Sequence, residues 1–334
     1  MSSEPQSNLA ERERVLVCGV LFPEFPTEFG GELSEISALV RAAGAEVVGV
    51  GVTQKRHTPH PATLMGKGKV EELRECVSSA DANLVIFDDE LTPAQGKALE
   101  DHIGVRVVDR AELILDIFAT RARTGEAKMQ VELAQLQYLL PRLKRMWTHL
   151  SRIRGGVGLR GPGETQLESD RRLIGRRIAD LRKKLQGVTQ ARAVQRQSRA
   201  GKFRVALVGY TNAGKSSLLR ALSEADLFVE DRLFATLDSA TRSVDLGEGF
   251  ETLVTDTVGF IRKLPHHLVA SFRSTLEEAR EADVLAHVVD ASYARWEDQK
   301  EVVEEVLEEL ELQGRPQILV FNKIDRLTHA EEEA

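Results

Sequence analysis

A glycine-rich turn at residues 209–216 constrains the fold of this chain more than any other feature of its sequence. The apolar run 204–208 precedes this turn, and residues 217–223 continue it with a helical pattern. A turn of this kind between a buried strand and a helix is typical of a phosphate-binding loop, because its glycines let backbone amides approach a phosphate at the helix N-terminus. The bare pattern arises by chance in about one protein of this length in a hundred. In this setting it predicts the strand–loop–helix unit of an α/β fold.

Each residue of this turn is a predicted nucleotide contact. The set comprises Gly209, Tyr210, Thr211, Asn212, Ala213, Gly214, Lys215, Ser216 and Ser217. Lys215 is expected to span the β- and γ-phosphates, and the Ser216 hydroxyl is expected to bind Mg²⁺. Asn212 could ligate an additional K⁺ beside the phosphates, and ordinary loop geometry accounts for it equally well.

A second motif, Asp256–Gly259, lies forty residues further on, at the end of another apolar strand pattern. Asp256 is placed to hold Mg²⁺, directly or through water, and the Gly259 amide is placed to meet the γ-phosphate. Between the two motifs, Thr236 is the first choice to close over Mg²⁺ and the γ-phosphate, and Thr241 is the second. The predicted Mg²⁺ ligands are therefore Ser216, Thr236 and Asp256.

The predicted catalytic groups are Lys215, Thr236 and Gly259. The position after Gly259 holds Phe260, where many enzymes that hydrolyse GTP carry a glutamine that orients the attacking water. A phenyl ring can neither orient nor deprotonate water. We therefore expect slow unaided hydrolysis, with the missing polar group or ordering supplied by a partner.

The strand pattern 316–321 ends in a sequence that selects the base. It is followed by Asn322, Lys323 and Asp325, the predicted guanine contacts. A carboxylate there can accept hydrogen bonds from the guanine N1–H and 2-amino group, whereas adenine offers neither, so the nucleotide is expected to be GTP or GDP. Only nine residues follow Asp325. Residues 201–334 are therefore expected to form a GTPase domain without its C-terminal end, with weak nucleotide affinity.

Residues 121–204 are strongly basic within an acidic chain. They hold 21 Lys and Arg against 6 Asp and Glu, whereas the whole chain has a net charge of −7. A basic block between acidic blocks indicates a polyanionic partner at one place. The alternative is a solvated helical face.

Two long helices with apolar seams are expected between residues 122 and 200. The first seam consists of Met129, Leu133, Leu136, Leu140, Leu143, Trp147 and Leu150. The second, with one arginine out of pattern, consists of Leu167, Arg171, Ile174, Ile178, Leu181, Leu185 and Val188. The heptad spacing predicts an antiparallel coiled coil whose tip is the loop 151–164. Pro141 is expected to kink the first helix.

The tip loop is basic and rich in glycine. Its predicted RNA contacts are Arg152, Arg154, Arg160, Gly155, Gly156, Gly158, Gly161 and Gly163. Such a backbone-rich tip can press against a phosphate-lined surface while its arginines pair with phosphates or stack on bases. A plain hairpin linker is the alternative.

Residues 14–121 are expected to form a smaller α/β domain. Short apolar runs alternate with helical patterns, which is typical of βαβ units on a parallel sheet. The turn Gly66–Lys69 could hold a phosphate on its exposed amides, although an ordinary glycine–lysine turn is favoured. Asp88 and Asp89 follow a strand, where sites are often found. Whether this domain binds a nucleotide stays open.

The remaining features favour a cytoplasmic protein. Residues 1–13 are polar and acidic and are expected to be a disordered tail. Cys18 and Cys76 lie in apolar stretches and are expected to be small buried hydrophobes in a reducing compartment. No apolar stretch reaches the roughly 18 residues that a membrane span requires. A fold-back hairpin satisfies both seams within one chain, so a monomer is expected.

The ordered motifs and the glycine-rich tip together resemble the HflX family of ribosome-associated GTPases. The resemblance is carried by Gly66–Lys69, Asp109–Arg110, Leu113–Phe118, Gln137–Arg142, Gly155–Gln166, Phe234–Asp238 and Asp256–Phe260. It implies binding to the large ribosomal subunit and its rRNA, with the tip reaching towards the peptidyl-transferase centre. It also implies GTP-dependent splitting of stalled ribosomes under heat or other stress. The family usually has Asp-Pro-Thr-Thr where this chain has Asp238–Thr241, and its members carry a C-terminal domain.

Two other functions are compatible with these motifs. One is a GTP-regulated RNA-binding module, in which turnover only times release. The other is a GTPase that acts on a different RNA. The sequence gives neither the stress trigger nor the order of hydrolysis and subunit splitting.

Overall fold

The chain forms two compact units, Met1–Leu113 and Ile114–Ala334. The computed structural model describes residues 13–22, 33–143, 162–197, 202–223, 232–265 and 278–327. The expected tail 1–13 lies outside them except for its last residue, as do Trp147, Leu150 and the tip loop up to residue 161. None of the helices in these ranges is long and apolar enough to cross a membrane.

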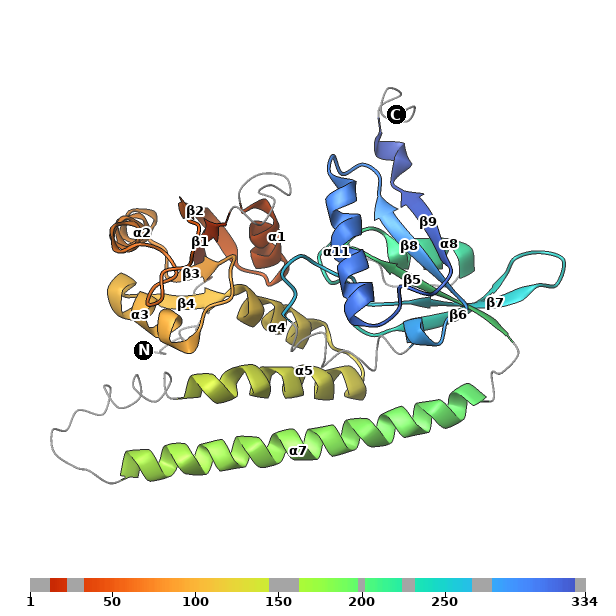
Figure 1. The fold of residues 1–334 in the computed structure, drawn as a ribbon, viewed down its shortest axis with the longest axis horizontal. Helices are drawn as coiled ribbons and strands as arrows, with labels where there is room; N and C mark the ends of the chain where they lie inside the picture. Colours follow the sequence, from red (N-terminus) through yellow and green to blue (C-terminus); the bar gives the residue numbers. More distant parts are fainter. Residues whose placement is uncertain are drawn as a thin grey trace, which may run out of the picture. The chain divides into compact units, whose positions relative to one another are not determined.

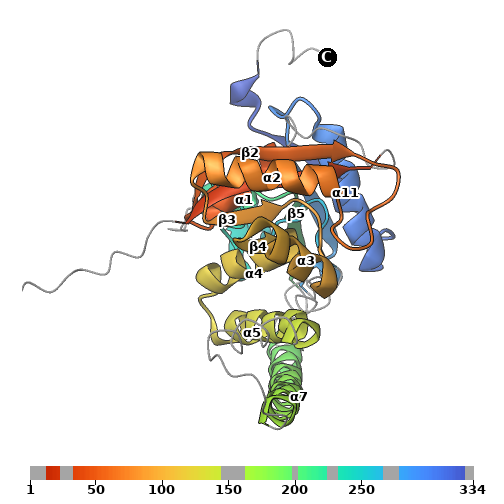
Figure 2. The ribbon, with the colours of Figure 1, turned by 90° about the vertical axis from the view of Figure 1, so that its left-hand side faces the viewer.

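The first unit is built on a four-stranded parallel sheet in the order β2-β1-β3-β4 (Figures 1 and 2). Its strands are β1 (Arg14–Leu21), β2 (Glu46–Lys55), β3 (Leu84–Phe87) and β4 (Arg106–Asp109). Its helices are α1 (Ser34–Ala42), α2 (Lys67–Ala80), α3 (Pro93–Ile103) and the start of α4 (Arg110–Arg121). The predicted parallel α/β fold is confirmed.

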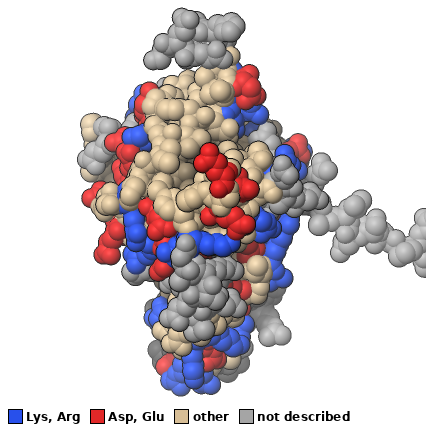
Figure 3. Space-filling view, turned by 90° about the vertical axis from the view of Figure 1, so that its right-hand side faces the viewer, with Lys and Arg blue, Asp and Glu red and all other residues tan. Residues whose placement is uncertain are grey.

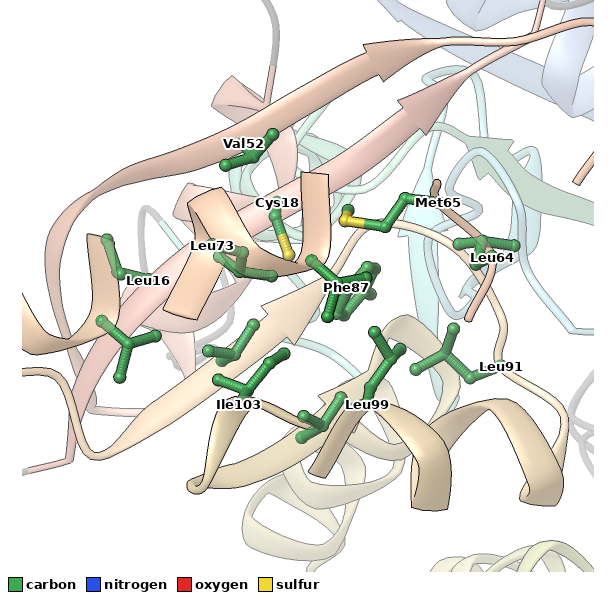
Figure 4. Packing of buried hydrophobic residues seen from close by; sticks show 14 of the residues in the cluster. Leu16, Cys18, Val52, Leu64, Met65, Leu73, Phe87, Leu91, Leu99 and Ile103 are labelled. Atoms are coloured by element: carbon green, nitrogen blue, oxygen red, sulfur yellow. The ribbon is translucent and has the colours of Figure 1, made fainter. Parts of the chain in front are cut away.

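Apolar side chains of the sheet and of α2 and α3 form the core of this unit (Figure 4). Phe87 and Leu73 are fully buried in it, and Cys18 is buried among them. Burial raises the pKa of the Cys18 thiol well above its ordinary value, and nearby carboxylates raise it further. Cys18 is therefore an inert part of the core, as expected, whereas Cys76 is half-buried.

Local sequence explains where α3 begins. The Thr92 hydroxyl accepts a hydrogen bond from the Gln95 amide at 3.2 Å, and the Gln95 side chain accepts one from the Thr92 amide at 3.0 Å. Pro93 occupies the first turn, where its missing N–H leaves no bond unmade.

The second unit begins with a helical hairpin. Helix α5 (Gly125–Leu139) passes into a 3-10 turn at Leu140–Arg142, and α7 (Pro162–Gln197) runs antiparallel to it (Figure 1). The 3-10 turn contains Pro141, which cannot donate the next α-helical hydrogen bond. The predicted apolar seams meet between the two helices. The shared cluster consists of Met129, Leu133, Leu136, Leu140, Ile174, Ile178, Leu181 and Leu185.

The predicted C-terminal boundary of the tip loop, residue 164, is wrong. Pro162, Gly163 and Glu164 belong to α7, although the glycine pattern predicted a loop to residue 164. A proline is well tolerated in the first turn of a helix, because its fixed φ suits the helix and its N–H would have no partner there. Arg171, which interrupts the second seam, is exposed to solvent.

A five-stranded sheet in the order β6-β7-β5-β8-β9 completes the second unit. Its strands are β5 (Phe203–Gly209), β6 (Ala240–Asp245), β7 (Glu251–Asp256), β8 (Val284–Asp290) and β9 (Gln317–Asn322). Only β6 is antiparallel to its neighbour. Helix α8 (Lys215–Ser223) follows β5, and α11 (Trp296–Glu309) connects β8 to β9. Because β5 has parallel neighbours on both sides, its carboxyl end lies where ligands bind in such sheets.

Candidate nucleotide-binding site

The turn between β5 and α8 has the backbone that the sequence predicted. Gly214 has φ of +96°, and a Cβ there would lie 2.1 Å from the Asn322 side-chain nitrogen. Only glycine fits this position, because any side chain would collide with Asn322 of the guanine motif at the end of β9. The same Asn322 nitrogen donates a hydrogen bond to the Ala213 carbonyl at 2.9 Å. The phosphate loop and the guanine motif are thus in direct contact.

Lys215 is buried at the start of α8. Its ammonium group donates hydrogen bonds to the carbonyl oxygens of Gly209 at 3.1 Å and Tyr210 at 2.8 Å. Burial lowers the pKa of Lys215 to about 8, and the Asp256 carboxylate opposes this shift. A polyphosphate beside this ammonium group would supply the negative charge that carbonyl oxygens supply only in part.

Three oxygen-bearing side chains converge beside Lys215. The Ser216 hydroxyl donates to Asp256 Oδ2 at 2.6 Å and lies 2.6 Å from the Thr236 hydroxyl. Burial raises the pKa of Asp256, opposed by Lys215 and by hydrogen bonds from the two hydroxyl groups. Thr241, the second choice, instead lies on β6 with its hydroxyl 2.9 Å from that of Thr255 on β7.

These oxygens fit a hard cation such as Mg²⁺. Within the described ranges, the Oδ1 atom of Asp256 is buried and has no hydrogen-bond partner. A buried carboxylate oxygen of this kind is expected to be paired or to coordinate a metal. The described part of the chain contains no group of three or more His, Cys, Asp or Glu side chains suited to a metal, and this site offers one carboxylate and two hydroxyl groups.

A cavity opens over the phosphate loop. Its lining residues are Thr211, Asn212, Gly214, Lys215, Ser216, Ser217, Arg232, Phe234, Ala235, Thr236, Thr257 and Gly259. Most of the predicted phosphate contacts, Thr236 and Gly259 therefore share one space. Arg232, Phe234, Ala235 and Thr257 line this cavity although they were not among the predicted contacts. Thr257 lies inside the predicted motif Asp256–Gly259, whereas no motif spacing identifies Arg232.

The segment after β7 is pinned to the phosphate loop by its backbone. The Thr211 amide donates to the Phe260 carbonyl at 2.7 Å, and the Phe260 amide donates to the Gly209 carbonyl at 3.1 Å. A Cβ on Gly259 would lie 2.6 Å from the Thr211 Cα. The ring of Phe260 is buried, with 1% of its surface exposed. This position therefore brings no polar side chain to the cavity.

The guanine motif follows β9 at the same edge of the sheet. Lys323 pairs with Asp290, at the end of β8, at 2.7 Å. Asp325 lies in a short 3-10 helix and is exposed to solvent. Asp290 was also missed, although an aspartate that ends an apolar run such as 284–289 is a signal that a scan of strand ends could find.

The predicted RNA contacts lie almost entirely outside the described residues. This holds for Arg152, Arg154, Arg160, Gly155, Gly156, Gly158 and Gly161, whereas Gly163 lies in α7.

Three sequence families match the chain in succession. The family described as GTP-binding GTPase N-terminal matches residues 31–119, and GTP-binding GTPase Middle Region matches residues 121–199. The family described as 50S ribosome-binding GTPase matches residues 204–323. Together with the phosphate loop and the guanine motif, these matches define a P-loop GTPase, an enzyme that binds GTP and hydrolyses it.

Individual relatives narrow this class. The GTPase HflX of Alkalihalophilus pseudofirmus is 50% identical over 318 residues, which are 95% of this chain and 75% of the relative. The GTPase HflX of Escherichia coli is 51% identical over 298 residues, 89% of this chain and 70% of the relative. The chain belongs to the HflX family of GTPases. The crystal structure of SsGBP with GDP is 26% identical, with a TM-score of 0.51 and coverage of 96% of this chain and 86% of that one.

Proposed function

We propose that this GTPase binds the large ribosomal subunit and uses GTP to promote the splitting of stalled ribosomes. The observation that carries the proposal is the match of residues 204–323 to the family described as 50S ribosome-binding GTPase. Hydrolysis is slow in the free protein and is stimulated by the ribosome.

Helix α7 supplies a surface for ribosomal RNA. Its exposed basic residues are Arg171, Arg172, Arg176, Arg177, Arg182, Lys183 and Lys184. Lys and Arg side chains gather at the lower end of Figure 3, where α7 lies. Only Glu168 and Asp180 are exposed acidic residues among the described side chains of this helix. A helix face of this charge favours the phosphate backbone, because each neutralised phosphate releases counterions.

The site divides the work of GTP hydrolysis among a few groups. Lys215 binds the β- and γ-phosphates, the Gly259 amide binds the γ-phosphate, and Asp325 selects guanine. Ser216, Thr236 and Asp256 would hold Mg²⁺, which neutralises the charge that develops on the phosphate oxygens. Asn212 could in addition hold K⁺.

The buried ring of Phe260 supports a requirement for a partner. Enzymes of this class that carry a glutamine at this position use it to orient the attacking water. Here the nearest side chain after Gly259 is apolar and buried. A water in the cavity must therefore be oriented by other groups, and the ribosome is the proposed source of this order.

Steady-state GTP turnover tests the proposal. We expect purified large subunits to stimulate turnover at least tenfold, and small subunits or transfer RNA to have little effect. Equal turnover with and without large subunits would remove the ribosome as the partner. Stimulation by transfer RNA alone would favour a GTPase that acts on a different RNA.

The role of α7 has a matched test. Arg171→Gln, Arg176→Gln and Arg182→Gln together remove three charges from this helix. The control removes three charges from the GTPase domain through Lys202→Gln, Arg242→Gln and Lys300→Gln. We expect only the α7 variant to lose affinity for large subunits. The slope of its log affinity against log salt concentration should correspond to about two to three fewer released counterions. The same affinity in both variants would contradict a specific role of α7.

Light scattering of intact ribosomes separates splitting from binding. We expect splitting with GTP and also with a non-hydrolysable GTP analogue, and none with GDP. Binding without splitting, both with GTP and with the analogue, would favour the alternative of a GTP-regulated RNA-binding module.

A further inference from the structure

Asp238 joins the segment that carries Thr236 to the start of helix α5. Its Oδ2 atom accepts hydrogen bonds from the backbone amides of Arg123 at 3.0 Å and Thr124 at 3.3 Å. Its Oδ1 atom accepts a hydrogen bond from the Thr124 hydroxyl. All these groups belong to the second unit, and 114 residues separate Thr124 from Asp238.

Thr124 is also the N-cap of α5. Its hydroxyl oxygen accepts a hydrogen bond from the Ala127 amide at 3.1 Å. The same hydroxyl therefore caps the N-terminus of α5 and donates a hydrogen bond to Asp238. The negative charge of Asp238 also lies at the N-terminus of α5, where the helix dipole favours it. Through α5 this contact reaches α7, which is tied to it by the apolar seam and by Glu132 with Arg177 at 2.7 Å.

A second contact holds the same segment on the other side of Thr236. The ring of Phe234 packs edge-on against the ring of Phe118 in α4, with centroids 4.7 Å apart and planes at 85°. Both rings are 1% exposed. The Phe234 amide donates to the Thr211 hydroxyl of the phosphate loop at 2.8 Å.

The backbone of Phe234 is strained, which shows that these contacts define its position. Its φ is +54°, in the left-handed region that a phenylalanine rarely adopts. Such a conformation persists only where its surroundings impose it. Thr236 lies between Phe234 and Asp238, so contacts from α4 and from the start of α5 flank it on both sides.

A cavity of about 160 Å³ lies beside this contact. Its lining includes Arg121, Arg123, Ser216, Thr236, Asp238 and Asp256. The start of the hairpin and the oxygen atoms that fit Mg²⁺ therefore border one space.

We infer that Asp238 is a positioning residue for GTP hydrolysis, because it holds Thr236 at the Ser216 hydroxyl only while the start of α5 is in place. The hairpin and the nucleotide site are then energetically linked, and the linkage is reciprocal. A partner that displaces α5 lowers the rate of hydrolysis, and the nucleotide state changes the order of the first turn of α5. This inference rests on the proposed role of Thr236.

Four variants test the inference: Asp238→Ala, Thr124→Ala, their combination, and Thr124→Ser. We expect Asp238→Ala to lower kcat at least tenfold while GDP affinity changes less than about twofold, because the proposed role of Thr236 is at the γ-phosphate, which GDP lacks. Thr124→Ala should lower kcat less, because it removes only one of the three hydrogen bonds that Asp238 accepts. The double variant should be no worse than Asp238→Ala, which already lacks that bond. Thr124→Ser keeps the hydroxyl and should restore kcat.

The control is Asp245→Ala, which removes an exposed carboxylate that binds the Gly247 amide at 2.9 Å, away from the site. It should leave kcat unchanged. Additive losses in the double variant would overturn the inference. A fall in kcat, GDP affinity and melting temperature together would also overturn it, because this pattern indicates general destabilisation.

Hydrogen exchange gives a readout that a merely structural contact would not change. We expect the amides of residues 126–129 to exchange more slowly with a GTP analogue than with GDP in the unaltered protein, and equally in Asp238→Ala. No difference in the unaltered protein would overturn the linkage. Thr236→Ala separates the role of Thr236 from that of Asp238. An unchanged kcat in Thr236→Ala would contradict the proposed role of Thr236. A lower kcat in Thr236→Ala with an unchanged kcat in Asp238→Ala would contradict the role of Asp238.

Discussion

Both units place charged side chains at the carboxyl ends of parallel strands, but the two sets of charges have different partners. In the first unit, the carboxylates that follow β3 and β4 bind groups of the same unit. Asp88 pairs with the buried Arg110, which also pairs with Glu35. Asp109 accepts hydrogen bonds from the Leu91 amide at 3.0 Å and the Glu112 amide at 2.8 Å. Here the charges stabilise the fold.

In the second unit, the charges at this edge are only partly compensated. The pKa of Lys215 is lowered by burial, and the pKa of Asp256 is raised by it. One buried oxygen of Asp256 has no hydrogen-bond partner among the described residues. The comparison teaches that position at the carboxyl edge does not by itself indicate a site. What distinguishes the site is that burial shifts the pKa of two neighbouring groups against their charged forms, downward for Lys215 and upward for Asp256.

Replacing Lys215 should produce the largest effect and sharpens the comparison most. Lys215→Met removes the cation that binds the β- and γ-phosphates, and we expect GTP turnover to fall about a thousandfold. Phosphate release at saturating GTP measures it. Lys202→Met, which removes an exposed lysine paired with Glu251, is the control and should retain turnover. Comparable losses in both variants would contradict a specific role of Lys215.

Replacing Arg110 should affect stability rather than chemistry. Arg110→Met removes the buried cation that pairs with the carboxylates of Asp88 and Glu35, so we expect the free energy of unfolding of the first unit to fall by roughly 3–5 kcal/mol. Urea unfolding measures it. Arg74→Met breaks an exposed pair with Glu71 and should cost less than about 1 kcal/mol. If Arg110→Met lost GTP turnover while its free energy of unfolding stayed unchanged, the contrast between the two units would be wrong, because the first unit would then take part in GTP hydrolysis.

Adding one methyl group to a glycine in each unit tests whether the two units differ in their importance for GTP turnover. Gly259→Ala places a Cβ 2.6 Å from the Thr211 Cα, so the backbone of the phosphate loop must shift. We expect turnover to fall about tenfold to a hundredfold. In Gly19→Ala the new Cβ meets a Leu33 side-chain carbon at 3.0 Å, and a side chain can yield. Turnover should be unchanged there, and an equal loss in both variants would count against the distinction.

The pH dependence of nucleotide binding should show the smallest effect. The free protein has a Lys215 pKa of about 8, below the ordinary value, because burial disfavours its charge. Bound phosphates favour the charged form and raise this pKa, so binding takes up a proton above pH 8. We expect affinity for GDP to be constant below about pH 7.5 and to fall by up to about tenfold per unit above pH 8. Calorimetry at pH 8.5 in two buffers should show the proton uptake, and its absence would contradict the lowered pKa.

The sequence predicted most of the fold through local patterns. The apolar runs 204–208 and 316–321 predicted β5 and β9 to within one residue at each end, and the heptad spacing predicted the seam between α5 and α7. Both patterns are strong because a buried face requires apolar side chains at the period of its own secondary structure. Strand β8 and helix α11 were not predicted, because neither contains one of the nucleotide-binding motifs.

The predicted phosphate contacts could be named together from the sequence, because the loop is one continuous segment whose conformation depends on its own glycines. The choice between Thr236 and Thr241 was different. Both threonines occur in the same stretch, and only the pairing of β6 with β7 places Thr241 opposite Thr255 and leaves Thr236 at Ser216. Spacing along the chain could rank them but could not place them.

What the sequence determined by itself is therefore the chemistry of contiguous segments: a phosphate loop, a guanine motif and two helices with apolar seams. The tertiary structure alone decided which distant charges meet. Asp88 and Asp238 are both aspartates in short polar segments, yet one binds a buried arginine and the other binds the start of α5. The reason is physical: hydrogen bonds between distant residues depend on strand order and helix placement, which the whole chain sets together.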